Sequence, residues 1–260
     1  MTRSRRKASK GGAAGRPWAG GLSPFARGNR LLHEGRHLEA VRLLRQASRA
    51  PGTAAGKAGD HRVHFNLGYA LAQTGRHLAA SRAFRRCLDL RPGDVDAWFN
   101  LGNAYREAGA LRRAKSAYAE AASIDSSDHE IWNNLGNIRA ALGEGRAAID
   151  AFRAALALQA DYHPAWNNLG NAWQSLGDPA KALACYDRAL ALQGGSDQIY
   201  HFNRALALMA AGRESEALRE IGRFAALSPF LDTDARTMGG PGWLRFLQSL
   251  APSRARREVR

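Results

Sequence analysis

Residues 129–136 read HEIWNNLG, and residues 163–170, one step of 34 further along the chain, read HPAWNNLG. The triplet Asn-Leu-Gly recurs at this interval in four places: 66–68, 100–102, 134–136 and 168–170. Self-similarity at a fixed period of this size indicates an array of repeats, in which each unit buries its apolar face only against its neighbours. The sequence therefore predicts one elongated domain built by stacking.

Each unit carries two apolar stripes at helical spacing. With the first position of four units placed at His61, Val95, His129 and His163, the residues at positions 4, 7, 8 and 11 fall on one face of a helix. Positions 20, 24 and 27 form the same kind of stripe on a second helix. Glycine or alanine at positions 8 and 20 allows the two helices to approach closely, and aromatic rings at positions 4 and 24 fill the remaining volume. Each unit is therefore expected to be a pair of packed helices.

A period of 34 with this pattern resembles the tetratricopeptide repeat (TPR). The residues that carry the resemblance are Trp98, Trp132 and Trp166 at position 4, the Leu-Gly pairs at positions 7 and 8, and Ala114, Ala148 and Ala182 at position 20. The resemblance implies an all-α, right-handed superhelical solenoid whose first helices line a concave groove. Two weaker units flank the clear ones, which gives about six helix pairs over residues 21–229, near 21–54, 61–94, 95–128, 129–162, 163–196 and 198–229.

The two ends of the chain differ from the array. Residues 1–20 are basic and rich in Gly, Ala and Ser, and we expect a disordered tail. An organelle transit peptide is the alternative for this segment; without one, the expected location is the cytoplasm. Residues 230–260 are predicted to form a loop, a helix near 243–250 that caps the last repeat, and a basic tail. The alternative for that helix is docking on a partner.

The net charge of +15 is concentrated at the ends. Residues 1–30 hold eight Lys or Arg and no acid, residues 243–260 hold five Arg and one Glu, and the remaining body is only +3. This distribution weakens a nucleic-acid interpretation, which requires a basic stripe on a folded surface. No apolar run approaches the roughly 18 residues that a membrane span needs, so we expect a soluble chain.

Catalytic and metal-binding motifs do not stand out in the sequence. There is no Gly-rich phosphate loop and no serine nucleophile motif. His61 and His64 lie three residues apart, a spacing that a metal could use, but no further ligand completes the set nearby. The two cysteines fall inside predicted helices, which favours a reducing compartment over a disulfide framework. We expect no catalytic residue, no cofactor and no metal.

Asparagine exceeds what the helices require. Position 6, which points away from the stripe between paired helices, and position 9 on the same side form two rows: Asn66, Asn100, Asn134, Asn168 and Asn203, and Asn103, Asn137 and Asn171. Asparagine is a mediocre helix former. Two interpretations stay open, since these amides can bridge neighbouring repeats or can bind the backbone of an extended peptide. Helices about 8–10 Å apart would bring one asparagine to every third residue of such a peptide.

The rows resemble the asparagine ladder in the repeat region of O-linked N-acetylglucosamine transferase, although nothing here corresponds to that enzyme's catalytic domain. The carboxylate clamp of chaperone-binding family members begins with lysine at position 5, and none of the units has lysine there. The predicted function is a protein–protein interaction scaffold or adaptor that binds an extended segment of a partner protein in the groove. The alternatives are a nucleic-acid-associated repeat that uses its basic termini, and a regulatory arm of an enzyme complex.

Overall fold

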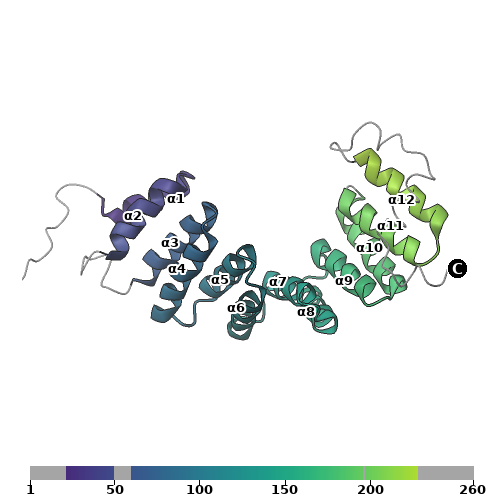
Figure 1. Cartoon of the computed structure of the whole chain (residues 1–260), viewed down its shortest axis with the longest axis horizontal. Helices are drawn as coiled ribbons and strands as arrows, with labels where there is room; N and C mark the ends of the chain where they lie inside the picture. Colours follow the sequence, from purple (N-terminus) through teal and green to yellow (C-terminus); the bar gives the residue numbers. More distant parts are fainter. Residues whose placement is uncertain (1–21, 50–59, 196, 228–260) are drawn as a thin grey trace, which may run out of the picture. The chain divides into compact units, whose positions relative to one another are not determined.

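The structure is a computed structural model that describes residues 22–49, 60–195 and 197–227. These residues form twelve α-helices and no strand, which confirms the all-α array of six helix pairs (Figure 1). The helices are α1 Pro24–His33, α2 His37–Arg49, α3 His61–Gln73, α4 His77–Leu90, α5 Val95–Glu107, α6 Leu111–Ile124, α7 His129–Ala141, α8 Gly145–Leu158, α9 His163–Ser175, α10 Pro179–Gln193, α11 Gln198–Ala210 and α12 Glu214–Leu227. The predicted tail 1–20 and capping helix 243–250 lie outside the described residues.

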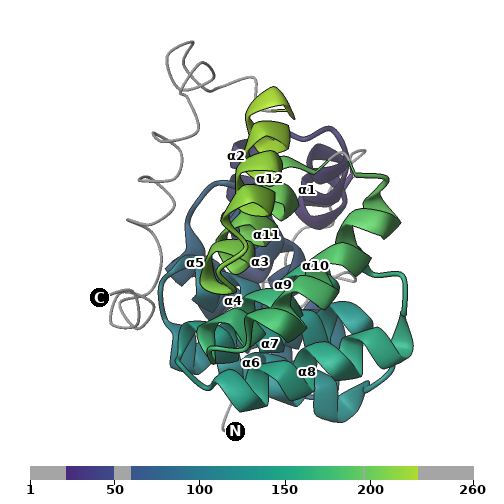
Figure 2. The same cartoon turned by 90° about the vertical axis from the view of Figure 1, so that its right-hand side faces the viewer.

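The chain divides into two compact units, unit 1 up to Ala110 and unit 2 from Leu111 onward. In unit 1, each of the helices α1 to α5 packs against the next along the chain. In unit 2, the helices α6 to α12 follow the same rule, and Figure 2 shows α12 lying along α11 at the end of the series. Within each unit, the core is therefore a series of interfaces between consecutive helices, as stacking requires.

The ends of the helices are specified by local sequence. Aspartates cap four of the first helices; the Asp94 side chain, for example, accepts a hydrogen bond from the Ala97 amide at 3.0 Å. The first helix of each pair stops at a glycine. Gly75 has φ of +72°, and the next amide, that of Arg76, returns to the Leu71 carbonyl at 2.9 Å. This geometry favours glycine because a side chain would be strained there.

The two helices of a pair meet where the first one has glycine at position 8. A Cβ atom added to Gly136 in α7 would lie 2.5 Å from Cε1 of Phe152 in α8, and Phe152 is fully buried. The same arrangement joins Gly68 to Phe84 and Gly170 to Tyr186. The ring therefore occupies the space that a side chain would fill, and this contact sets the separation of the helices.

The tryptophans at position 4 are less buried than the apolar stripe predicts. Trp132 is half-buried, and its Nε1 donates a hydrogen bond to the Ser126 carbonyl at 2.9 Å, in the turn before its helix. Trp98 and Trp166 bond in the same way to Pro92 and Ala160. Trp132 and Trp166 pack against the buried core as partly buried residues, so the expectation of core packing is correct only in part. An indole combines an apolar body with a polar N–H, and here it joins the core to the connection between repeats.

Candidate functional site

The asparagines at position 6 lie on the first helices, and in unit 1 one of them bridges two repeats. The Nδ2 of Asn66 in α3 donates to Oδ1 of Asn29 in α1 at 2.7 Å. Both side chains are half-buried. The bond holds each amide in a fixed orientation between the two first helices.

Two more bridges of this kind occur in unit 2. Asn168 in α9 donates to Asn133 in α7 at 3.0 Å, and Asn203 in α11 donates to Asn167 in α9 at 2.9 Å. We call these three bonded pairs the amide pairs. The acceptors Asn133 and Asn167 are only 6% and 7% exposed, whereas the donors are half-buried. The bridging interpretation therefore describes the contacts of Asn66, Asn168 and Asn203.

The acceptor asparagines were not among the predicted site residues. Asn133 and Asn167 occupy position 5, one residue before the row that the sequence singled out. The doublet Asn-Asn at 133–134 and 167–168 was visible in the sequence. The bridging role of this doublet could not be predicted, because the partner of each amide lies on the first helix of the neighbouring repeat.

The other predicted residues have different surroundings. The Nδ2 of Asn100 donates to the Asp96 carbonyl of its own helix at 2.8 Å, so this amide forms no bridge. Asn171 accepts a hydrogen bond from the Tyr186 hydroxyl at 2.7 Å, which ties it to the second helix of its own pair. The side chains of Asn103, Asn134 and Asn137 are half-buried on α5 and α7. The two rows are thus not uniform.

A bridged amide keeps part of its hydrogen-bonding capacity. Each asparagine side chain offers two N–H donors and an oxygen with two lone pairs. In an amide pair, the donor uses one N–H, and its own Oδ1 accepts none of the bonds that join the pair. Because the donor side chain is half-buried, a ligand could reach these atoms. The arrangement can present an oriented acceptor and donor to a peptide group.

A hollow of about 260 Å³ lies beside the amide pair of unit 1, between α1, α3 and the start of α5. Its lining residues are Phe25, Asn29, His61, Arg62, Phe65, Asn66, Asp94 and Asp96. The Arg62 guanidinium bonds to Asp60 at 2.9 Å and lies 5.9 Å from the centre of the Phe25 ring. The Arg62 hydrogen bond lowers the pKa of the Asp60 carboxyl. The volume is below the roughly 300–1,000 Å³ of small-molecule sites, so it suits a single side chain better than a cofactor.

In the last pair, the buried carboxylate of Glu220 joins the buried His201 to two arginines that are partly or largely exposed. Nδ1 of His201 lies 2.7 Å from Oε2 of Glu220, and guanidinium nitrogens of Arg204 and Arg223 lie 2.8 and 2.6 Å from Oε1 of the same carboxylate. Nε2 of His201 contacts the Gly195 carbonyl at 3.0 Å. Because the carboxylate and both ring nitrogens are engaged by groups of the protein, the network is suited to holding α11 and α12 together.

The described residues also include further histidines and both cysteines. They contain no group of three or more His, Cys, Asp or Glu side chains arranged to hold a metal ion. His64 is half-buried, and burial lowers its pKa. Burial raises the pKa of the Cys87 and Cys185 thiols to about 12 and about 11, so both stay neutral near pH 7. Within the described ranges, no helix is long and apolar enough to cross a membrane.

Comparisons with known proteins agree with the geometry. Four sequence models of the tetratricopeptide repeat match the chain, at residues 25–94, 71–138, 129–162 and 163–195. The comparison with curated proteins gives no match. Among solved structures, the chain is similar to MamA, with 24% identity over 64% of this chain and 91% of that one, at a TM-score of 0.60.

Two further structures give the same picture. A fragment of MamA from Desulfovibrio magneticus RS-1 is 16% identical over 69% of this chain and all of that one, at a TM-score of 0.63. YrrB, described as a TPR protein with an unusual peptide-binding site, is 16% identical over 69% of this chain and 91% of that one, at a TM-score of 0.58. At these identities, the likeness concerns the fold alone.

Proposed function

Because this chain belongs to the tetratricopeptide repeat family, we propose that it is a non-catalytic scaffold or adaptor whose first helices bind an extended peptide segment of a partner protein. The observation that carries the proposal is the set of amide pairs. A fixed amide on consecutive first helices offers a peptide backbone regularly spaced donors and acceptors. Peptide binding is also what the description of YrrB, a protein of similar fold, names for that protein.

The bridges support this proposal because they reduce the entropic cost of binding. A free asparagine loses rotamer freedom when it bonds to a ligand, whereas a bridged one is already ordered. Contacts to backbone would tolerate many partner sequences. The oriented amides therefore suit a scaffold that holds segments of varied sequence, and the hollow beside Phe25 and Phe65 would accept one side chain of such a segment.

The test must separate binding from folding. Asn168→Ala is unsuitable because it leaves the Asn133 oxygen buried without its donor, which costs about 1–3 kcal/mol of stability. Asn133→Leu/Asn168→Ala is a better variant because it removes both partners of one amide pair within unit 2, so no buried amide is left without its partner. The matched control is Gln46→Ala, which removes an exposed amide from a second helix.

Twelve-residue peptides selected from a phage-displayed random library serve as the probes. Their dissociation constants are measured for the natural chain and for the Asn133→Leu/Asn168→Ala variant. Two lost neutral hydrogen bonds of about 0.5–1.5 kcal/mol each should weaken binding about 5- to 150-fold. The melting temperature should not fall, and Gln46→Ala should bind normally. Undiminished affinity of the double variant for every selected peptide would refute the role of these amides.

A further inference from the structure

The second helices of unit 1, α2 and α4, carry the same types of exposed residue at three matching positions. Positions 18, 22 and 25 hold Leu38, Arg42 and Arg45 in α2, and Leu78, Arg82 and Arg85 in α4. Steps of four and three residues place each set on one face of its helix. All six side chains are exposed, and the leucines reach 62% and 58% exposure. We call these two sets the outer stripes.

Stacking of the repeats does not require the outer stripes. In unit 2, none of the second helices combines a leucine with two arginines at the same positions, which are occupied by Arg112, Ser116 and Ala119 in α6, Arg146, Asp150 and Arg153 in α8, Ala180, Ala184 and Asp187 in α10, and Ser215, Arg219 and Gly222 in α12. The intervening residues of α2 and α4 also differ, as at Glu39 and Ala79. The outer stripes therefore need a reason other than the fold.

In the described part of the chain, the arginines of the outer stripes form no ion pair with a carboxylate; the pKa of Glu39 is lowered mainly by its hydrogen bond to Arg36 and, to a smaller extent, by the charge of Arg42. The helices α2 and α4 hold six arginines but only two acids, Glu39 and Asp89. Glu39 is bonded to Arg36 at 2.6 Å, and Asp89 lies 4.0 Å from Arg86. Through the described ranges, no carboxylate comes within 4 Å of the guanidinium groups of the outer stripes. The surface thus offers four guanidinium groups that form no ion pair within the described residues, and such groups bind carboxylates well because of their planar, two-pronged geometry.

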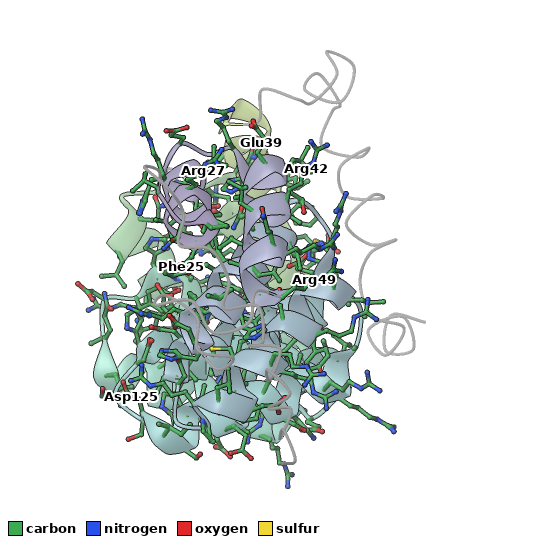
Figure 3. The ribbon with its side chains drawn as sticks, turned by 90° about the vertical axis from the view of Figure 1, so that its left-hand side faces the viewer. Phe25, Arg27, Glu39, Arg42, Arg49 and Asp125 are labelled. Atoms are coloured by element: carbon green, nitrogen blue, oxygen red, sulfur yellow. The ribbon has the colours of Figure 1, made fainter. Side chains whose placement is uncertain are left out.

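The leucine of α2 borders a depression in the surface. A hollow of about 520 Å³ lies between the start of α2 and the end of α3, lined by Gly35, Arg36, His37, Leu38, Glu39, Gln73 and Thr74. Figure 3 shows Arg42 and Arg49 of α2 on the other side of the end pair from Phe25 of α1. The outer stripe of α2 is therefore separate from the hollow that includes Phe25.

We propose that the outer stripes of α2 and α4 bind an acidic segment of a partner protein that carries apolar side chains among its carboxylates. The apolar side chains would cover Leu38 and Leu78, and the carboxylates would pair with the arginines. The tails of this chain are excluded as occupants because residues 1–30 and 243–260 are themselves basic. A second copy is disfavoured by the net charge of +15 on each molecule. Nucleic acid would use the arginines but would leave the exposed leucines without a function.

Binding to the full chain is measured by fluorescence anisotropy with three labelled probes. The first is a helical peptide that has Leu at intervals of three and four residues along one face and Glu beside them. The second is the same peptide with Gln in place of Glu, and the third is a single-stranded oligothymidine. We expect the Glu peptide to bind and the Gln peptide to bind about tenfold or more weakly. Arg82→Gln/Arg85→Gln should weaken the Glu peptide about 2- to 30-fold, as two partly exposed ion pairs would. Leu38→Ser/Leu78→Ser should weaken it about tenfold.

Two control variants make the result specific. Arg146→Gln/Arg153→Gln removes two exposed arginines from α8 and should leave binding unchanged. Asn133→Leu/Asn168→Ala should also leave it unchanged, so that this surface and the proposed peptide site on the first helices can fail independently. Failure of the Glu peptide to bind would overturn the proposal. The proposal would also be wrong if oligothymidine bound as tightly as the Glu peptide and the leucine substitutions had no effect. An equal loss of Glu-peptide affinity in the Arg146→Gln/Arg153→Gln control would contradict it as well.

Discussion

The contact between Gly136 and Phe152 makes a prediction whose sign is opposite to that of ordinary helix propensity. Replacing a mid-helix glycine by alanine normally stabilises a helix by about 1 kcal/mol. At Gly136, the new Cβ would lie 2.5, 2.7 and 2.9 Å from three atoms of the Phe152 ring, whereas carbon atoms normally approach to about 3.5–4.0 Å. Phe152 is 1% exposed, so the ring has no free space to move into.

Overpacking of this kind costs about 1–3 kcal/mol, and the buried ring places Gly136→Ala in the upper part of that range. After subtraction of the helix gain, we expect a net loss of about 1–2 kcal/mol. Gly222→Ala is the matched control, since Gly222 lies within α12 with open space where its Cβ would be. It should stabilise by about 0.5–1 kcal/mol. Urea unfolding followed by circular dichroism measures both variants.

A double-mutant cycle then identifies the cause. Phe152→Leu removes the ring atoms that Cβ would meet, so Gly136→Ala should cost less in that background, with a coupling energy of about 0.5–3 kcal/mol. If Gly136→Ala stabilises the chain as Gly222→Ala does, or if its effect adds to that of Phe152→Leu without coupling, the reasoning about this interface is wrong.

Three further results are expected. Trp132→Phe should cost about 0.5–1.5 kcal/mol through loss of the bond to the Ser126 carbonyl, and Trp132→Ala roughly 2–3 kcal/mol in urea unfolding, less than a fully buried ring would. Glu220→Ala should cost about 3–5 kcal/mol and speed amide exchange in α11 and α12, whereas Glu216→Ala, from an exposed ion pair, should cost less than about 1 kcal/mol. Because burial raises the pKa of Cys87 to about 12, iodoacetamide should label it at pH 8 only after denaturant is added, and its contribution to stability should decline above about pH 9, where the unfolded thiol ionises while the folded one does not.

The fold was predictable because its determinants are local and repeated. Three features act within a single 34-residue repeat: glycine at position 8, an aromatic ring at position 24 and a glycine after the first helix. The exposure of Trp132 was not predictable from the stripe, since helical periodicity assigns a whole residue to one face. An indole instead divides its surface between the core and a backbone carbonyl, and that carbonyl, on Ser126, lies outside the helix.

The candidate site was predictable only in part, for a different reason. Helical angles placed the position 6 row off the interface between paired helices, and Asn66, Asn168 and Asn203 do lie there. The partner of each amide depends on how neighbouring repeats are staggered, and residue spacing within a single repeat does not reveal this. The interpretations that the sequence left open, bridging and peptide binding, are therefore compatible, because a bridge fixes an amide without using all of its hydrogen-bonding groups.

The net charge summed over the repeat array likewise hides a local feature of the surface. Residues 31–242 sum to only +3, which argued against a basic folded surface. The sum is small because acids elsewhere in the array cancel the arginines of α2 and α4, although they lie on other helices. Exposed charges more than about 10 Å apart are largely screened from each other in physiological salt, so a partner responds to the local excess and not to the total. In a solenoid, charge therefore has to be counted helix by helix and face by face, and this count is what distinguishes the outer stripes from the second helices of unit 2.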